Sequence, residues 1–89
     1  MQRLAYGKAL LAAGRVKEAR AQFERLRDAG LDTRELGLVA AQAAAADSDA
    51  ASAVAWLQSI PRSLRPENLA REPAFRSIAG RPEFRALFD

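Results

Sequence analysis

The chain has 89 residues, 49% of them hydrophobic, and a formal net charge of +3. This length suits one small domain with a single core, and the composition is not that of a disordered chain. Cysteine and histidine are absent, which excludes disulfides, thiolate chemistry, most zinc sites and histidine acid–base catalysis.

The charges are unevenly distributed along the chain. Residues 1–30 carry seven basic and three acidic side chains, whereas residues 31–61 carry Arg34 against four acidic ones. A basic excess permits nucleic-acid binding. However, acids and bases alternate in pairs such as Lys17-Glu18, which is typical of a solvated helix face. We therefore rank a nucleic-acid partner as the weakest of the binding hypotheses and do not expect one.

The apolar runs are too short to cross a membrane. Lys8, Arg15, Gln42 and Asp47 interrupt them, and a membrane-spanning helix needs about 20 apolar residues. Nothing in the composition requires an oxidising compartment. We therefore expect no membrane span and a cytoplasmic location.

The first half of the chain predicts a helical hairpin. Apolar and small residues recur every three or four positions over residues 1–13, and Gly14 ends this helix. A second helix is predicted over residues 16–29, and Gly30 stops it as a C-terminal cap would. Its apolar face consists of Val16, Ala19, Phe23 and Leu26.

Two further helices are predicted before Pro61. Asp32 or Thr33 begins the third helix as an N-cap, and it continues to about Ala46. Its run of alanines over residues 40–46 has high helix propensity and little bulk, which suits close packing against neighbours. The fourth helix is predicted over residues 50–60.

The two hairpins repeat with a period of 34 residues. A shift of this length places Gly14 on Ser48. The same register pairs Gly7 with Ala41, Leu10 with Ala44, Ala19 with Ala53, Phe23 with Leu57 and Leu26 with Ile60. Because the paired residues share small or apolar character, we interpret the period as an internal structural repeat.

This period and pattern resemble the tetratricopeptide repeat (TPR) family. In that family 34 residues form two antiparallel helices, with a glycine at the turn and a small residue and an aromatic in the second helix. The matching positions are Gly7, Gly14, Ala19 and Phe23 in repeat one and, more loosely, Ala41, Ala53 and Leu57 in repeat two. The chain departs from the family at Arg3, where tryptophan is common, and at Ser48, where the turn glycine would be.

The C-terminal part predicts a cap for the repeats. Two units begin with Pro73 and Pro82 and place an aromatic and an aliphatic residue three positions apart on one face. Their apolar residues are Phe75, Ile78, Phe84 and Leu87, and Phe88 is a further candidate. Similar tails close the arrays of many bacterial TPR proteins. A last repeat needs such a cover because its apolar face has no next neighbour.

Catalysis has little support in the sequence. Asp47 and Asp49 lie in a turn, where capping is the obvious role, and they lack the number and spacing of ligands that a calcium site needs. On the surface of the second helix, Arg20 and Glu24 are four residues apart and predict a local ion pair. We expect no enzyme activity, no cofactor and no metal.

Peptide binding is the function that the resemblance implies. In stacked hairpins the first helix of each repeat lines a concave groove, where a peptide can lie. Family groove positions carried onto this chain are Leu4, Lys8, Leu11, Glu35, Leu38, Val39 and Gln42. The leucines could equally pack in the core. Leu4 and Val39 stand where the chaperone-binding subclass uses lysine and asparagine, so chaperone tails are not expected.

We therefore expect an all-α fold of antiparallel helical hairpins stacked as a short right-handed TPR-like solenoid with C-terminal capping helices. It would form one domain over residues 1–89, with repeat one at 1–33, repeat two at 34–61 and the capping tail at 62–89. The expected function is protein or peptide binding in a scaffold or adaptor. The alternative is homo-oligomerisation or the termination of a larger array, because Tyr6, Leu10 and Ala13 predict an uncovered apolar edge.

Overall fold

The computed structural model describes residues 3–31, 33–61, 63 and 72–88, and all regular structure among them is helical. The elements in chain order are α1 (Arg3–Ala12), α2 (Val16–Asp28), α3 (Arg34–Ala46), α4 (Ala50–Gln58), the 3-10 helix η3 (Pro73–Ile78), α5 (Pro82–Arg85) and the 3-10 helix η4 (Ala86–Phe88). The all-α prediction is confirmed for this part of the chain.

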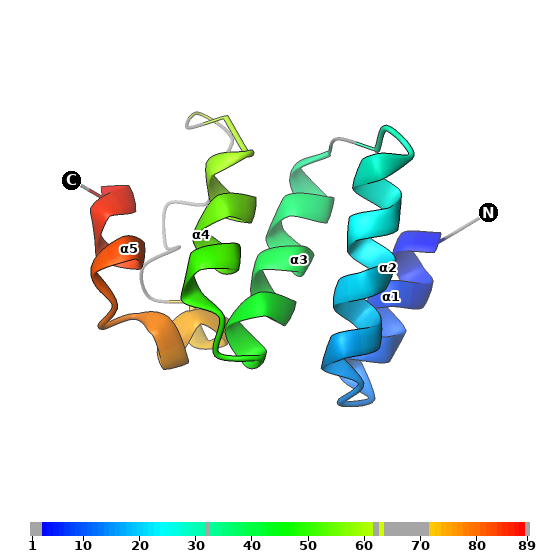
Figure 1. The fold of residues 1–89 in the computed structure, drawn as a ribbon, viewed down its shortest axis with the longest axis horizontal. Helices are drawn as coiled ribbons and strands as arrows, with labels where there is room; N and C mark the ends of the chain where they lie inside the picture. Colours follow the sequence, from blue (N-terminus) through cyan, green and yellow to red (C-terminus); the bar gives the residue numbers. More distant parts are fainter. Residues whose placement is uncertain (1–2, 32, 62, 64–71, 89) are drawn as a thin grey trace.

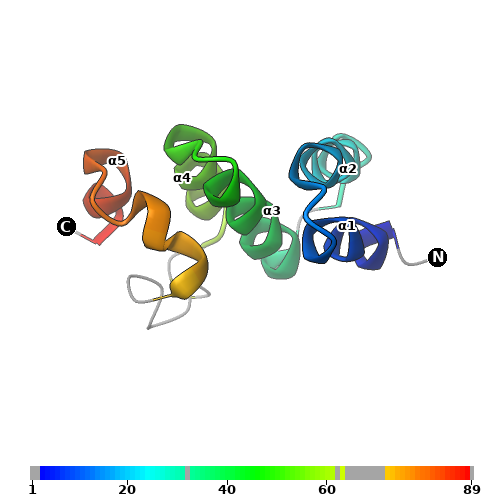
Figure 2. The same ribbon diagram turned by 90° about the horizontal axis from the view of Figure 1, so that it is seen from below.

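The four longer helices form two neighbouring hairpins. α1 packs against α2, α3 packs against α4, and α2 contacts α3 (Figure 1). Seen from below, α2 and α4 lie in one layer and α1 and α3 in the other (Figure 2). η3 packs on α3 and α5 packs on α4, so the short helices cover the side of the second hairpin that faces away from the first.

Both hairpins turn with the same backbone geometry. Gly14 has φ +84° and Ser48 has φ +57°, in the left-handed region. In each turn the next residue donates its backbone N–H to a carbonyl five residues earlier, at 2.9 Å. This is the Schellman arrangement, which satisfies the last carbonyls of a helix. The 34-residue period is thus present in the backbone of the turns.

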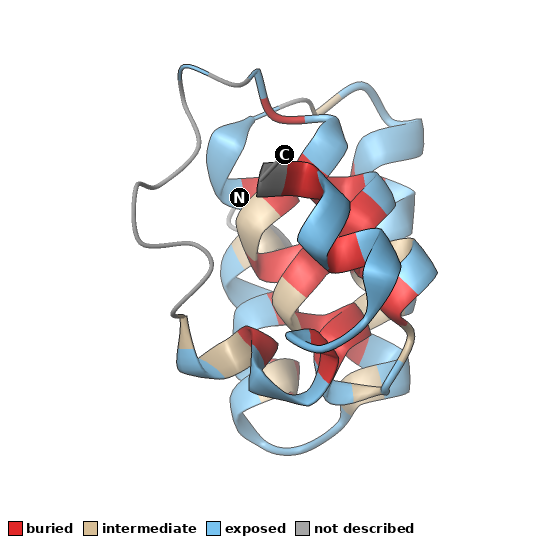
Figure 3. Cartoon of the chain, turned by 90° about the vertical axis from the view of Figure 1, so that its left-hand side faces the viewer, coloured by how far each residue is buried: buried red, intermediate tan, exposed pale blue. Residues whose placement is uncertain are grey.

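The period also extends to packing. Five of the pairs that the shift defines are buried in both hairpins: Gly7 with Ala41, Leu10 with Ala44, Ala19 with Ala53, Phe23 with Leu57 and Leu26 with Ile60. Buried segments lie where helices face one another, and the exposed ones lie on the outside (Figure 3). These five pairs of equivalent positions therefore perform equivalent packing roles.

α3 is the most enclosed helix of the described structure. It contacts α2, α4, η3 and α1. Its central alanines, Ala40, Ala41, Ala43, Ala44 and Ala45, are at most 1% exposed. Small side chains allow neighbouring helices to approach the backbone closely, so the low bulk predicted for this helix suits its central position.

The C-terminal helices dock as the apolar spacing predicts. Phe75, Ile78, Phe84 and Leu87 are buried, and the rings of Phe75 and Phe84 have centroids 5.7 Å apart. The Ser77 hydroxyl donates to the Ala45 carbonyl oxygen at 2.9 Å, which ties η3 to the end of α3. The side chain of Phe88 lies outside the described residues, as do Asp32 and most of the segment before Glu72.

Gly7 marks a close approach between α1 and α2. A Cβ built at Gly7 would lie 2.5 Å from Cε1 of Phe23, whose side chain is fully buried. A similar approach occurs at Gly37, where a Cβ would lie 2.7 Å from Cγ1 of Ile60. Gly7 therefore sets how closely α1 can pack against the Phe23 ring.

Replacement of Ser48 by glycine should stabilise the fold. A left-handed conformation costs an L-residue about 1 kcal/mol, whereas glycine adopts it freely. We expect Ser48→Gly to raise the free energy of unfolding by about 0.5–1 kcal/mol and Gly14→Ser to lower it by a similar amount. Urea denaturation followed by circular dichroism measures both changes. Equal stability of the two variants would contradict the shared turn geometry.

Gly7→Ala should destabilise the chain, although alanine normally improves a helix interior by about 1 kcal/mol. The clash with Phe23 is an overpacking cost of about 1–3 kcal/mol, so we expect a net loss in urea denaturation. Gly80→Ala is the matched control, because a Cβ there meets no atom within 4 Å. A Gly7→Ala variant more stable than the native chain would show that the close approach is absent.

Candidate functional site

Two exposed helix surfaces meet where α1 lies beside α3. Lys8 on α1 and Glu35 on α3 form an ion pair, with 2.8 Å between Nζ and Oε1. Their side chains are 49% and 57% exposed, so the pair lies at the surface. We call this surface the α1–α3 face, and its predicted members are Leu4, Lys8, Leu11, Glu35, Leu38 and Gln42.

The apolar members of the α1–α3 face are only partly buried. Leu4, Leu11 and Leu38 pack against the core but keep part of their surface exposed, so they contribute to both the core and the face. Gln42 is also half-buried. These positions can offer apolar surface to a ligand while the core beneath holds them in place.

Val39 does not belong to this face. It was predicted to line the groove, but it is buried with 9% of its surface exposed and forms part of the core. Consecutive helical residues point about 100° apart, so Val39 turns inward where its neighbour Leu38 remains accessible. The predicted list of groove residues therefore includes one residue of α3 that is buried in the core.

The α1–α3 face carries little net charge. Lys8 and Glu35 neutralise each other, and an exposed pair of this kind contributes at most about 1 kcal/mol to stability. The amide of Gln42 can donate and accept hydrogen bonds. The face therefore offers leucine side chains beside one ion pair and one amide.

The acidic residues of the second turn bind a cation from the first hairpin. Nη1 and Nη2 of Arg20 lie 2.7 Å from Asp47 Oδ2 and 2.8 Å from Asp49 Oδ2. The predicted local pair of Arg20 with Glu24 is therefore wrong. Arg20 is only 22% exposed and reaches across to a turn that supplies two carboxylates. Both acids have a structural role in joining the hairpins.

Asp49 also caps α4. Its Oδ1 accepts a hydrogen bond from the Ser52 backbone N–H at 3.1 Å, and its Oδ2 accepts one from the Ser52 hydroxyl at 2.8 Å. These bonds from Ser52, followed by the one from Arg20, lower the pKa of Asp49 to about 2. Burial lowers the pKa of Arg20, but its hydrogen bonds to Asp49 and Asp47 outweigh that effect and raise the pKa overall.

A second contact between the hairpins was not predicted from the sequence. The guanidinium carbon of Arg27 on α2 lies 4.8 Å from the ring centroid of Trp56 on α4. Trp56 is 9% exposed, so the cation covers an almost buried ring and gains a cation–π attraction. The sequence placed Trp56 on an apolar helix face but gave no signal for its partner, which comes from the other hairpin.

The low pKa of Asp49 predicts a pH-dependent loss of stability. Because the folded pKa lies below the ordinary value of 3.8, the contribution is present above about pH 4 and is lost as the pH falls toward 2. In urea denaturation at pH 6, Asp49→Asn should be less stable than the native chain, and the two should converge near pH 2. Asp28→Asn, at an exposed carboxylate, is the control. A constant difference between pH 6 and pH 2 would contradict this assignment.

Neither the described residues nor comparisons with known proteins assign a function to the chain. No cluster of three or more potential metal ligands occurs in the described part of the chain. None of the helices described there combines the length and apolar character that a membrane crossing requires. No protein-family model, curated protein or solved structure matches the chain. A functional hypothesis must therefore rest on the residues and geometry of the chain itself.

Proposed function

We propose that this chain is a protein–protein interaction module that binds a peptide segment of its partner on the α1–α3 face, in a scaffold or adaptor role. The observation that carries the proposal is the Lys8–Glu35 ion pair. The pair joins side chains 27 residues apart in sequence. It brings the surface of α1 next to the surface of α3, and each of these surfaces contains partly exposed leucine side chains. A ligand lying across the pair would contact both hairpins.

The expected ligand is a peptide with apolar anchor residues. Leu4 and Leu11 on α1 and Leu38 on α3 provide partly exposed apolar surface on both sides of the ion pair. Burial of this surface would supply the main binding energy, at about 25 cal/mol per Å² of apolar area. Gln42 would fix the register by hydrogen bonding to the peptide backbone or to a polar side chain.

The TPR-like arrangement is part of the same proposal. The repeated Schellman turns at Gly14 and Ser48 and the separation of α1 and α3 from α2 and α4 into two layers (Figure 2) support it. In a right-handed TPR-like solenoid the first helices of successive hairpins line the binding surface. α1 and α3 are those helices here.

A second candidate function is assembly: homo-oligomerisation, or termination of an array within a larger protein. One observation favours it. η3 and α5 cover the second hairpin, whereas Tyr6 at the opposite edge is 56% exposed. An exposed large apolar side chain at the edge of a stack is a candidate contact for another protein surface.

The peptide-binding proposal predicts a loss of affinity when the face becomes acidic. Peptides selected from a random displayed library on the native chain are measured by fluorescence polarisation. In the Lys8→Glu, Gln42→Glu double variant, a new carboxylate faces Glu35 and a second one replaces the amide. We expect at least a tenfold weaker Kd, or about 1.4 kcal/mol.

The matched control introduces the same substitutions in the other layer. Lys17→Glu on α2 and Gln58→Glu on α4 change exposed residues and should leave the Kd within about twofold, because neither lies on the α1–α3 face. Equal helicity of all variants is verified by circular dichroism. An unchanged Kd in the first double variant, or an equal loss in the control, would refute binding at this face.

A further inference from the structure

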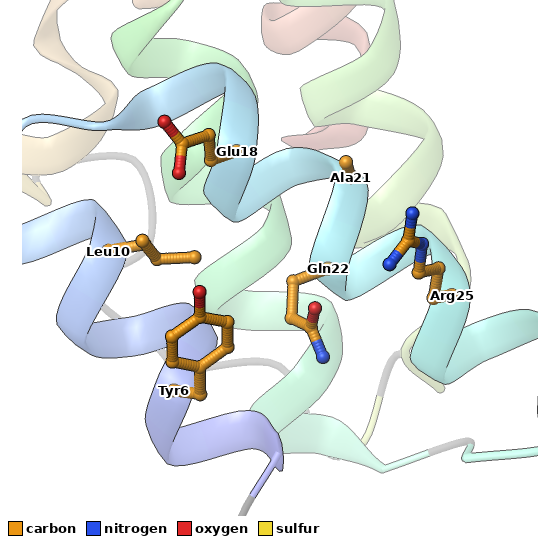
Figure 4. Close-up of a pocket in the computed structure, with 6 residues that line it drawn as sticks. All are labelled: Tyr6, Leu10, Glu18, Ala21, Gln22 and Arg25. Atoms are coloured by element: carbon orange, nitrogen blue, oxygen red, sulfur yellow. The ribbon is translucent and has the colours of Figure 1, made fainter.

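The outer edge of the first hairpin carries a hollow between α1 and α2. Its volume is about 200 Å³, and it is lined by Tyr6, Leu10, Glu18, Ala21, Gln22 and Arg25 (Figure 4). Tyr6 is the exposed large apolar side chain of the described structure. Leu10 is 8% exposed, so the bottom of the hollow is apolar. The charged side chains of Glu18 and Arg25 line its edges. We call this surface the α1–α2 edge.

The internal repeat shows that the α1 side of this edge corresponds to buried positions of α3. The 34-residue shift places Tyr6 on Ala40 and Ala9 on Ala43. Both alanines are at most 1% exposed, in a helix that packs against the preceding hairpin through α2, whereas Tyr6 and Ala9 are exposed. Two positions that are buried in α3 are thus exposed in α1.

The charges of the α1–α2 edge match a second copy of themselves. Glu18 and Arg25 lie seven residues apart on α2, which is two helical turns or about 10 Å, with Ala21 and Gln22 between them. Arg25 forms no ion pair with a described residue. Glu18 has an exposed partner, Arg15, at 3.6 Å. In a two-fold pair, two residues at equal distances from the axis each face the other's counterpart in the second copy, so Glu18 and Arg25 are placed to attract one another across this edge.

We propose that two copies of this chain pair through their α1–α2 edges about a two-fold axis near Ala21 and Gln22. The α2 helices then run antiparallel, and Glu18 lies opposite the partner's Arg25 at both ends of the contact. Ala21 permits close approach, and Tyr6 becomes buried. This inference deepens the assembly candidate, and it leaves the α1–α3 face of each copy open.

The charge pattern permits a charge-swap test of the full chain. Sedimentation equilibrium over a range of concentrations gives the dimer Kd. Glu18→Arg and Arg25→Glu each place like charges opposite one another and should raise the Kd at least tenfold. The double variant restores opposite charges and should return the Kd to within about threefold of the native value. Glu24→Arg, an exposed site outside the hollow, is the control.

Tyr6→Ala provides an independent readout because it removes apolar area without changing charge, and it should also raise the dimer Kd at least tenfold. A monomeric mass at every concentration, no rescue in the double variant, or an unchanged Kd for Tyr6→Ala would overturn the proposal. Peptide affinity on the α1–α3 face is measured in parallel with Glu18→Arg. It should remain unchanged, so failure of the dimer and failure of peptide binding are distinguishable.

Discussion

Close packing around α3 is the constraint on which the rest of the structure depends. α1, α2, α4 and η3 contact this helix, and its central alanines are buried almost completely. Larger side chains at these positions would push the neighbours outward, because protein interiors have few voids to absorb added volume. The hairpin α3–α4, its contact with α2 and the docking of η3 therefore all require a helix with little bulk. The position of Glu35, and with it the α1–α3 face, follows from that packing.

Polar contacts join the two hairpins through side chains of α1 and α2. Arg20 bridges to Asp47 and Asp49, and Arg27 covers the ring of Trp56. Each contact joins α2 to the second hairpin on the side away from the α1–α3 face, whereas Lys8 and Glu35 join α1 to α3 on that face. The hairpins are thus held on both sides, and a ligand would meet two helices whose relative orientation is already fixed.

Residue spacing and residue type predicted the features that depend on neighbouring residues in the sequence. Helix positions, the turn at Gly14 and the prolines that open η3 and α5 follow from spacing and residue type, and the structure contains them. The N-cap of α3 was predicted at Asp32 or Thr33, and the structure has Thr33 in that role. Features that join the hairpins were not predictable in this way. The four-residue rule gave Arg20 the wrong partner because its real partners are 27 and 29 residues away.

The candidate site shows the same limit. The ion pair of Lys8 with Glu35 depends on how the hairpins pack, and no sequence spacing revealed it. The resemblance predicted seven groove residues and included Val39, which is buried, because family positions do not specify which of two adjacent residues turns inward. The direction of a side chain on α3 is decided by the neighbours of that helix.

Native-state amide hydrogen exchange tests the central position of α3 most directly. If α3 is enclosed by the neighbouring helices, the amides of residues 40–45 should exchange only through global unfolding, with protection equal to the full free energy of unfolding. Amides of α1 and α5 should exchange sooner through local opening. Exchange of the α3 amides as fast as those of α1, at a free energy well below that of unfolding, would contradict the account.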